Sequence, residues 1–389
     1  MSELAVVPLA DALDFREGPG IMAVDFHQSG VPLIRLAGLK PGADLLTGCN
    51  YLDPEKVEAK WQHFRVEEGD VLLSTSASLG EVAIVSAEGV GAVPYTGIIR
   101  FRPKGDKVAQ EFIQYALRSP GFKQQIIEMG VGSVMNHFGP SHLKHMKLTL
   151  PTIEQQRGIA AVLGALDAKI AANTRKESTA ASLIEAMYQR AVRAPGTVTE
   201  PLMEILTVAF GEPFGGAQFV PAGKGRPLIR IRDLKTFSSQ VWTTESRPKE
   251  VLVQPGDVVV GMDAEFRPTW WLGKPGLLNQ RVCRVTADEA GPAFVREALR
   301  APMGRIEGYK TGTTVIHLNK SDLLREHILW PMADVRADFD RRTEPVLRAL
   351  VAGAQERDRL AAMRDALLPE LMSGRIRVKD AERVVEGAV

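Results

Sequence analysis

The chain contains one series of short motifs twice, and this duplication constrains its fold more than any other feature. The copies run in the same order from Gly30 and Gly225 to Pro151 and Pro331, and the separation between them shortens only slightly along the way. Five motifs in an unchanged order indicate a duplicated domain and predict a pseudo-two-fold internal repeat. The paired segments are 30–39 and 225–234, 69–73 and 256–260, 112–120 and 294–302, 132–137 and 312–317, and 150–151 and 330–331.

The length and composition allow two globular domains with ordinary cores. Of the 389 residues, 45% are hydrophobic and 24% are charged. No apolar stretch approaches the ~18 residues of a membrane span and no signal-peptide pattern is visible, so we expect a cytoplasmic protein. Cys49 and Cys283 lie in different repeats without metal-binding spacing, and we expect reduced, buried thiols. The net charge of +1 means that affinity for nucleic acid must come from locally placed Arg and Lys, or from a more basic partner.

Each repeat has the pattern of a mixed α/β domain. Phe112 and Phe294 begin segments with apolar residues at helical spacing, and we expect Pro120 and Pro302 to stop these helices. Short apolar runs bounded by Gly, Pro, Asp or Ser predict strands at 71–73, 82–85, 98–101, 258–260 and 282–285.

A long helical segment follows each repeat. Thr152 and Gln155 fit a capping box, and residues 154–193 then form a 40-residue pattern, about 60 Å long as a helix. We expect the second helix to have Pro345 in its first turn and to end at residues 373–374. A two-fold relation would make the two helices pack side by side and antiparallel. The alternative is that each helix only completes the core of its own domain.

Motifs for catalysis or for phosphate binding are missing from the sequence. It contains no Gly-rich phosphate loop, no G-x-G-x-x-G, no H-E-x-x-H and no nucleophile elbow. His137, His142 and His145 are close in sequence, but no carboxylate or Cys accompanies them at ligand spacing. We therefore favour polar loop side chains over a metal site. A duplicated protein without a catalytic constellation is expected to be a binding protein.

Three stretches carry a resemblance to a known family. Residues 150–170 contain Leu-Pro-Thr-Ile-Glu-Gln-Gln-Arg, residues 360–374 contain Leu-Leu-Pro-Glu-Leu-Met-Ser-Gly, and residues 256–263 with 278–283 form the third stretch. They resemble the DNA-specificity (S) subunits of type I restriction–modification enzymes. The resemblance implies an α/β, mixed α+β fold with two similar target-recognition domains separated by two long antiparallel spacer helices. The implied segments are a first recognition domain (1–150), a central spacer helix (151–195), a second recognition domain (196–332) and a distal spacer helix with tail (333–389).

The resemblance also implies a function. Each recognition domain would read one half of an asymmetric, double-stranded DNA target, and the helices would set the spacing and dock two modification subunits. Those subunits methylate adenine with S-adenosylmethionine, and restriction subunits join them to cut DNA with ATP and Mg²⁺. The chain itself would be non-catalytic and would bind no cofactor or metal. Two alternatives remain: an assembly scaffold that uses the paired helices without reading DNA, and a free-standing enzyme.

Polar side chains in loops are the candidates for reading bases. For each of them the alternative is a turn whose hydroxyls bond their own backbone. Trp270 and Trp271 could stack on a base or pack in the core, and residues 279–281 could contact base edges or form a strand. The DNA-binding candidates are Arg35, Ser74, Thr75, Ser76, Ser133, Asn136, His137, Arg230, Arg232, Met262, Asp263, Arg267, Thr313, Thr314 and His317, with Ser78 and Glu265 beside them.

The apolar stripes of the long helices are the candidates for contact with the modification subunits. Spacing at i, i+3, i+4 and i+7 places these side chains on one face of each helix. Polar residues at 173–178 interrupt the first stripe. The candidate residues are Ile159, Val162, Leu163, Leu166, Ile170, Leu350, Leu360, Met363 and Leu367.

Overall fold

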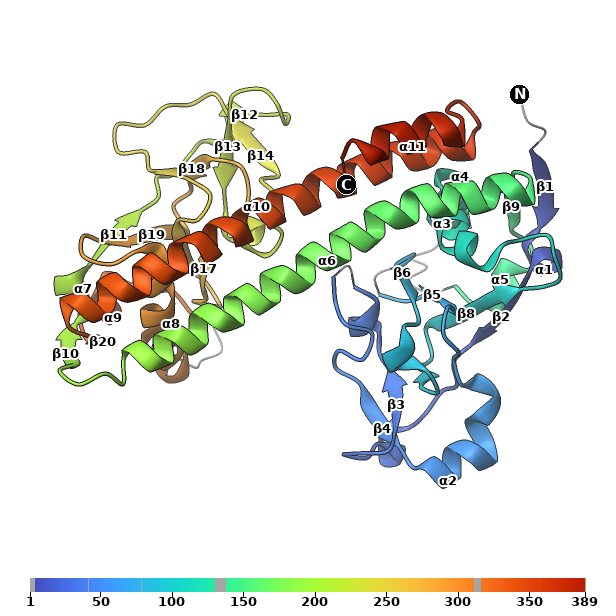
Figure 1. The fold of residues 1–389 in the computed structure, drawn as a ribbon, viewed down its shortest axis with the longest axis horizontal. Helices are drawn as coiled ribbons and strands as arrows, with labels where there is room; N and C mark the ends of the chain where they lie inside the picture. The colour runs from blue at the N-terminus through green and yellow to red at the C-terminus, as the bar shows by residue number, and fades with distance from the viewer. Residues whose placement is uncertain (1–3, 41, 78, 130–137, 311–315, 389) are drawn as a thin grey trace. The chain divides into compact units, whose positions relative to one another are not determined.

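Each repeat of the sequence belongs to its own structural unit. The computed structural model describes residues 4–40, 42–77, 79–129, 138–310 and 316–388. Unit 1 comprises Met1–Ala171 and Leu360–Val389, and unit 2 comprises Ala172–Arg359. The two long helices (Figure 1), α6 (Ile153–Ala191) and α10 (Ala333–Met372), each contribute one part to unit 1 and the other part to unit 2. The predicted boundaries place each long helix in a single segment, whereas the two structural units divide both helices. The boundaries of recognition domains and spacers stay predictions.

Unit 1 contains three sheets. β1 (Ala5–Pro8) pairs antiparallel with β9 (Lys147–Leu150). A four-stranded sheet has the order β2 (Leu13–Glu17), β8 (Ile98–Pro103), β5 (Val71–Ser74) and β6 (Val82–Ile84), and a three-stranded sheet the order β4 (Asn50–Leu52), β3 (Val31–Ile34) and β7 (Val93–Pro94). The helices are α1 (Leu9–Ala12), α2 (Pro54–Lys56), α3 (Ile113–Arg118), α4 (Pro120–Met129), α5 (Pro140–Leu143) and α11 (Val378–Glu386).

Unit 2 repeats this topology, and its third sheet has five strands where that of unit 1 has three. β10 (Val198–Pro201) pairs antiparallel with β20 (His327–Trp330). The four-stranded sheet has the order β11 (Leu206–Phe210), β19 (Val282–Ala287), β16 (Val258–Gly261) and β17 (Pro268–Trp270). The third sheet has the order β12 (Phe219–Val220), β14 (Val241–Thr243), β13 (Arg226–Ile229), β18 (Gly276–Leu278) and β15 (Leu252–Val253), and the helices are α7 (Leu202–Ile205), α8 (Pro292–Tyr309) and α9 (Lys320–Leu323).

The matching strand orders confirm the duplication. In both units the strand that contains Pro-Leu-Ile pairs parallel with a later strand, β3 with β7 and β13 with β18. The strand after Gly-Asp lies third in the four-stranded sheet of each unit. A mixed α/β fold with two similar domains is therefore confirmed.

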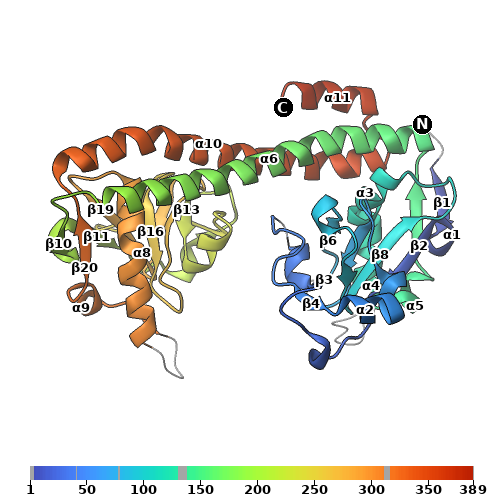
Figure 2. The same ribbon diagram turned by 60° about the horizontal axis from the view of Figure 1, so that its bottom comes forward.

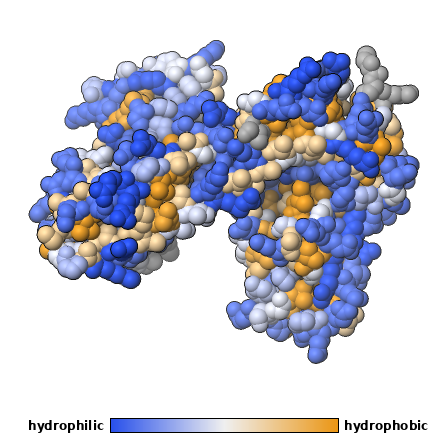
Figure 3. All heavy atoms as spheres, viewed as in Figure 1, coloured by the Kyte–Doolittle hydropathy of each residue, from blue (hydrophilic) through white to orange (hydrophobic). Residues whose placement is uncertain are grey.

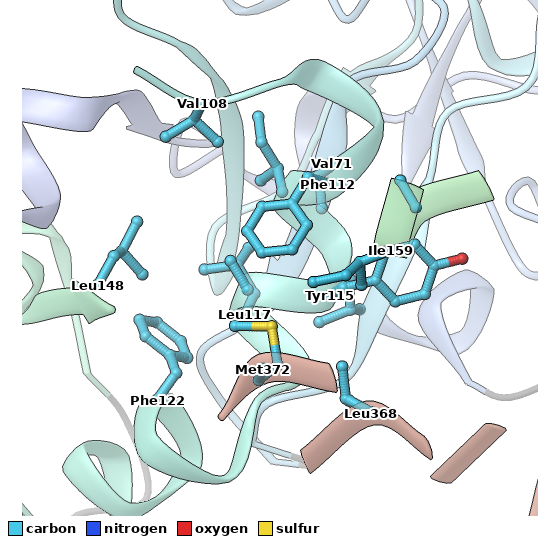
Figure 4. Packing of buried hydrophobic residues seen from close by; sticks show 14 of the residues in the cluster. Val71, Val108, Phe112, Tyr115, Leu117, Phe122, Leu148, Ile159, Leu368 and Met372 are labelled. Carbon is cyan, nitrogen blue, oxygen red and sulfur yellow. The ribbon is translucent and has the colours of Figure 1, made fainter. Parts of the chain in front are cut away.

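The strands after the Gly-Asp motifs are apolar at their first three positions because both of their faces are covered. Val258 and Val260 pack in the same cluster as α8, whereas Val259 packs with Ile229 and Trp271 on the other face. Side chains alternate between the two faces of a strand, so a strand between two layers needs an unbroken apolar run. Figure 2 shows α8 beside β16, and Figure 4 shows the cluster of unit 1 on the helical side of its sheet.

The expectation that a proline stops each short helix holds only for unit 1. There α3 ends at Arg118 and α4 begins at Pro120. In unit 2, α8 continues through Pro302, which is buried. Proline removes one backbone hydrogen bond, but the packing of an 18-residue helix against its sheet offsets that loss.

α6 agrees with the sequence in length, whereas α10 is longer than predicted. α6 begins after the Thr152–Gln155 capping box, in which Thr152 N–H donates to the Gln155 side chain at 3.2 Å and Gln155 N–H donates to Thr152 at 3.4 Å. α10 ends at Met372, before Ser373 and Gly374, as predicted. Its predicted start at Pro345 is wrong, because α10 begins at Ala333 and Pro345 lies on its exposed side, where water can solvate the carbonyl group that loses its partner.

The two long helices pack against each other through polar side chains near their middles. In unit 2, Asn173 donates to Glu356 at 2.7 Å and Arg357 pairs with Glu177 at 2.6 Å. Burial raises the pKa of Glu177, and Arg357 opposes this shift. Tyr188 lies 6.4 Å from Phe339, centroid to centroid, so residue numbers rise along α6 as they fall along α10. The antiparallel arrangement is confirmed, and the polar interruption of the stripe is explained by these pairs.

A second polar cluster links both long helices to α3 in unit 1. Asp167 of α6 accepts from Tyr115 at 2.8 Å and from Arg364 of α10 at 2.8 Å, and Arg118 lies 3.5 Å from it. Burial and the neighbouring carboxylate raise the pKa of Tyr115, so its hydroxyl stays a donor. This cluster joins three segments that are far apart in the sequence.

One buried side chain joins each repeat to the helix that follows it. Gln156, which is 1% exposed, accepts from Ala109 N–H at 2.9 Å and donates to the carbonyl groups of Lys107 and Pro151 at 3.0 Å each. Its counterpart Arg336, 5% exposed, donates to Pro331 O and to Glu289. Gln156 follows Pro151 at the same spacing as Arg336 follows Pro331, so two different side chains perform the same role in the two units.

The cysteines are both free thiols, as expected. Cys283 is buried, and burial raises the pKa of its thiol to about 12. Cys49 is only partly buried, so the expectation of burial is wrong for it. Within the described part of the chain, no helix combines the length and the apolar character that crossing a membrane requires.

Gln156→Leu should destabilise unit 1 by about 3 kcal/mol, because it leaves a buried N–H, the buried carbonyl group of Pro151 and the partly buried carbonyl group of Lys107 without partners. Denaturant unfolding followed by circular dichroism measures this loss. The matched control is Arg157→Ala, which changes the next, exposed residue of α6 and should stay within about 0.5 kcal/mol of the wild type. Equal stability of the two variants would contradict the role of Gln156.

The Asp167 cluster can be tested against its apolar counterpart in unit 2. Leu347 and Ile184 occupy the positions of the other repeat that correspond to Asp167 and Arg364, and both are buried. Asp167→Leu alone should cost about 2 kcal/mol, because it removes the shared acceptor of a cluster that is about one quarter exposed. Adding Arg364→Ile should recover at least half of that loss, since the pair is then replaced as a whole. If the loss of stability in the double variant equals the sum of the losses in Asp167→Leu and Arg364→Ile measured singly, the coupling is contradicted.

Candidate nucleic-acid interface

The strand after each Gly-Asp motif runs into a loop of the same conformation in both units. Ala77 after β5 and Ala264 after β16 have positive φ angles of 57° and 64°. This left-handed conformation is unfavourable for a residue with a Cβ, and such strain is concentrated at functional loops. Each alanine follows the aspartate of its Gly-Asp motif, Asp70 or Asp257, at the same spacing, so the loop conformation belongs to the repeat.

Backbone hydrogen bonds hold both loops to the same two neighbouring segments. One neighbour is the turn before β8 in unit 1 and before β19 in unit 2. The other is the segment before α5 in unit 1 and before α9 in unit 2. Because these bonds use only main-chain groups, they place the loop without fixing the side chains that it carries. The matching bonds are Thr75 N–H to Gly97 O at 2.8 Å and Met262 N–H to Arg281 O at 2.9 Å, then Phe138 N–H to Thr75 O at 3.0 Å and Leu318 N–H to Met262 O at 2.8 Å.

In unit 2 this framework brings together three charged or titratable side chains. Asp263 Oδ1 lies 2.5 Å from His317 Nδ1 and 3.5 Å from Arg281 Nη1. Arg281 and His317 are about half exposed, at 50% and 48% of their side chains, whereas Asp263 is 21% exposed. The predicted residues Asp263 and His317 thus meet, and they do so beside Arg281.

The surroundings of this cluster are partly fixed and partly open. Lys310, at the end of α8, donates to His317 O at 2.7 Å and pairs with Asp322 at 2.7 Å. Arg267 is 82% exposed and lies 3.6 Å from Glu265. An ion pair this exposed is weak, so the Arg267 guanidinium is available for a phosphate group.

Of the two predicted arginines Arg230 and Arg232, the first is held by a neighbouring carboxylate and the second is exposed. Arg230 bonds Asp233 through its N–H at 2.9 Å and through Nε at 3.3 Å, and Asp233 is 1% exposed. Arg232 is exposed and has no hydrogen-bond or ion-pair partner among the described residues. Ile231 between them packs on Gly261, where an added Cβ would lie 2.9 Å from the Ile231 side chain. The helical turn that carries Arg232 therefore lies next to the loop after β16.

In unit 1 the predicted hydroxyl side chains lie mostly inside the molecule. Ser74 and Thr75 are 1% and 0% exposed, and Ser74 Oγ accepts from Glu81 N–H at 2.9 Å. Ser74 therefore serves its own turn, which is the alternative that the sequence left open. Ser76 is half-buried, and its Oγ lies where a Cβ on Gly97 would stand. Ser76 is thus the best-placed of the three serine and threonine candidates at this loop.

Arg35 of unit 1 is held by aromatic rings. Its guanidinium carbon lies 4.1 Å from the ring centre of Tyr95 and 5.5 Å from that of Phe26. Tyr95 in turn donates to Ile21 O at 3.2 Å. These cation–π contacts fix the orientation of Arg35, and the sequence did not indicate them because Phe26 and Tyr95 lie in different loops.

Several predicted residues lie outside the described part of the chain. Nothing can therefore be said of their positions, and their roles stay predictions. They are Ser78, Ser133, Asn136, His137, Thr313 and Thr314.

The tandem tryptophans follow the less specific of their two interpretations. Trp270 and Trp271 are buried, and their indole N–H groups donate to Pro292 O at 3.0 Å and Lys274 O at 2.7 Å, so they pack in the core. His142 Nδ1 accepts from Gly139 N–H at 3.2 Å. No group of three or more His, Cys, Asp or Glu side chains among the described residues is arranged to hold a metal ion.

The apolar stripes of α6 and α10 are covered by the chain itself. Of the nine predicted partner-contacting residues, seven are buried, and Ile170 and Met363 pack partly buried against the same cluster as the other unit 1 residues. A partner on these helices would therefore contact other faces, where Ile153 and Leu183 of α6 are exposed. Hydrophobic and hydrophilic residues are mixed on the face of the molecule drawn in Figure 3. The buried seven are Ile159, Val162, Leu163, Leu166, Leu350, Leu360 and Leu367.

The sequence of this chain is similar to those of known proteins. Residues 43–180 match the family model described as type I restriction modification DNA specificity domain. The EcoBI specificity subunit of Escherichia coli is 28% identical over 190 residues, which cover 47% of this chain and 40% of that subunit. The MjaIX specificity subunit of Methanocaldococcus jannaschii is 21% identical over 355 residues, which cover 80% of this chain and 79% of that subunit.

A solved structure shares the fold over almost the whole chain. The S subunit of a type I restriction–modification system from M. genitalium superposes with a TM-score of 0.59 at 13% identity, covering 95% of this chain and 96% of that one. The alignments span about two fifths of the EcoBI and MjaVIII subunits. The resemblance seen in the sequence is confirmed: the chain is similar to the DNA-specificity subunits of type I restriction enzymes.

Ala264→Gly should raise the free energy of unfolding by about 0.5 kcal/mol, because relief of the left-handed strain exceeds the entropic cost of glycine. Ala264→Val should lower it by more than about 1 kcal/mol, since a β-branched side chain tolerates this conformation least. Denaturant unfolding provides the measurement. Ala349→Gly, on the exposed side of α10, is the control and should cost about 1 kcal/mol. A destabilising Ala264→Gly would contradict the strain.

Proposed function

We propose that this chain is the non-catalytic DNA-specificity subunit of a type I restriction–modification complex. Each recognition domain would read one half of a bipartite, asymmetric target in double-stranded DNA. The observation that carries the proposal is the loop framework after the Gly-Asp strands, which both units share in its backbone and which differs in its side chains. A shared backbone supports one mode of binding, and different side chains support different base sequences.

The charge distribution is consistent with a subunit that binds DNA as part of a complex. The chain has a net charge of only +1, and several arginines near the loops are engaged by carboxylates or aromatic rings. Non-specific affinity for DNA depends on the number of phosphates that a protein neutralises. Larger partner subunits would therefore supply most of the phosphate contacts.

The proposed partners are two modification subunits and, in the restricting complex, restriction subunits. α6 and α10 would dock the modification subunits on their exposed faces and set the gap between the half-sites. S-adenosylmethionine, ATP and Mg²⁺ would be bound by those partners, and the complex would act on DNA in the cytoplasm. This chain would contribute target choice and assembly, without catalysis.

Co-expression with its modification subunits, followed by methylome sequencing of the host, should reveal one bipartite motif methylated at adenine. Replacing residues 1–149 by the first recognition domain of a relative should change one half of that motif and leave the other half intact. The reason is that each domain folds on its own sheets and carries its own loop.

An assembled complex that methylates no defined motif would contradict the proposal and would favour a scaffold role. Assembly is checked independently by size-exclusion chromatography with light scattering. Methyl transfer or DNA cleavage by the purified chain alone would contradict the non-catalytic assignment.

A further inference from the structure

We propose that Arg281 reads a guanine base in the half-site of the second recognition domain, and that Asp263 positions it for this task. The inference rests on the proposed function and names the residue that determines one position of the target. It is carried by the cluster of Asp263, Arg281 and His317 at the loop after β16.

The hydrogen-bond roles in this cluster leave one side of Arg281 open. At 2.5 Å from Asp263 Oδ1, His317 Nδ1 carries a proton and donates it to the carboxylate. The same nitrogen cannot then accept from Arg281, although Nη1 lies 3.3 Å from it. Arg281 is therefore held through Asp263 Oδ1, 3.5 Å from Nη1. Among the described residues, Nε and Nη2 of Arg281 have no partner.

An arginine oriented in this way suits the edge of a guanine. Guanine presents O6 and N7 as two adjacent acceptors in the major groove, and a guanidinium group can donate to both. The backbone of Arg281 is fixed as well, because Arg281 O accepts from Met262 N–H at 2.9 Å. With the main chain and Nη1 both held, little side-chain freedom would be lost on binding.

Asp263 is better explained as a positioning residue than as a base contact. A carboxylate facing DNA is repelled by the phosphates, but this one is 21% exposed and has two donors close by, one of them a guanidinium group. Lys310 fixes the backbone of His317 from the other side. The carboxylate thus orients Arg281 while its own charge is balanced locally.

The repeat supplies a comparison within the same chain. In unit 1, the carbonyl group that receives the loop N–H belongs to Gly97, which is therefore the counterpart of Arg281. Ser76 comes directly before Ala77, as Asp263 comes directly before Ala264, so Ser76 is the counterpart of Asp263. A Cβ on Gly97 would collide with Ser76 Oγ, so the first loop cannot accommodate a side chain there without rearranging. The aspartate–arginine pair of unit 2 is replaced by serine and glycine, as different half-sites would require.

Arg281→Lys tests the guanine contact in the assembled complex with its modification subunits. Binding is measured by fluorescence anisotropy on duplexes that carry each single base change in the second half-site, the half that the domain exchange leaves intact. We expect the variant to lose about 10- to 100-fold of its preference for guanine at one position, because lysine cannot make the planar bidentate contact. Asp263→Asn should lower the same preference by a smaller factor, without affecting other positions.

The double variant Asp263→Ser with Arg281→Gly reproduces the unit 1 pair and should abolish the preference at that position only. Arg325→Ala, which removes an exposed arginine on the turn after α9, is the matched control and should leave all preferences unchanged. Circular dichroism melting of each variant in complex separates loss of folding from loss of reading.

Three outcomes distinguish the possibilities. A position that loses its preference for guanine in Arg281→Lys and in the double variant supports the inference. Weaker binding to all duplexes, with a salt dependence reduced by about one counterion, would make Arg281 a phosphate contact and overturn it. Unchanged preferences would overturn it as well, while the proposed function itself fails only if the wild-type complex shows no sequence preference at all.

Discussion

The buried polar contact between each repeat and the long helix that follows it is the constraint on which the structure depends. Gln156 and Arg336 each satisfy carbonyl groups of the proline junction and of a loop in the preceding domain. Such a contact is directional, so the helix leaves its domain in a defined orientation, which apolar packing alone would not impose. These bonds therefore tie the helix to the domain that precedes it in the sequence. A binding loop of that domain is held in place from within its own unit.

The fold could be predicted from the sequence to a large extent because it rests on periodic and local signals. The apolar runs at 71–73 and 258–260 predicted strands, and the Thr152–Gln155 box predicted the start of α6. Errors occurred where tertiary packing outweighs a local rule. Pro302 lies within α8 and Pro345 within α10, because long packed helices tolerate the loss of one hydrogen bond. No sequence pattern reports how much packing a helix will gain.

The site was less predictable, since residue type does not reveal which way a loop side chain points. Asp263 and His317 were identified and do meet, but Ser74 and Thr75 are buried. The Tyr95 ring below Arg35 could not have been found from the sequence, because that contact joins segments far apart in the chain. The left-handed alanines also leave no trace in residue type. The correspondence of Arg281 with Gly97 also came from backbone hydrogen bonds and lies outside the five motifs that the sequence aligns.

The main-chain framework around the recognition loops has a consequence for how such proteins change over generations. Bonds between N–H and carbonyl groups hold the loops after β5 and β16, and they persist whichever side chains the loops carry. Under the proposed function, a substitution at the position of Asp263 or Arg281 would then alter the preferred base while the sheet beneath remains intact. New targets would thus be reachable one residue at a time, and independently in each half of the molecule. In each unit, the side chains of the loop can therefore vary while the main-chain hydrogen bonds that hold the loop stay the same.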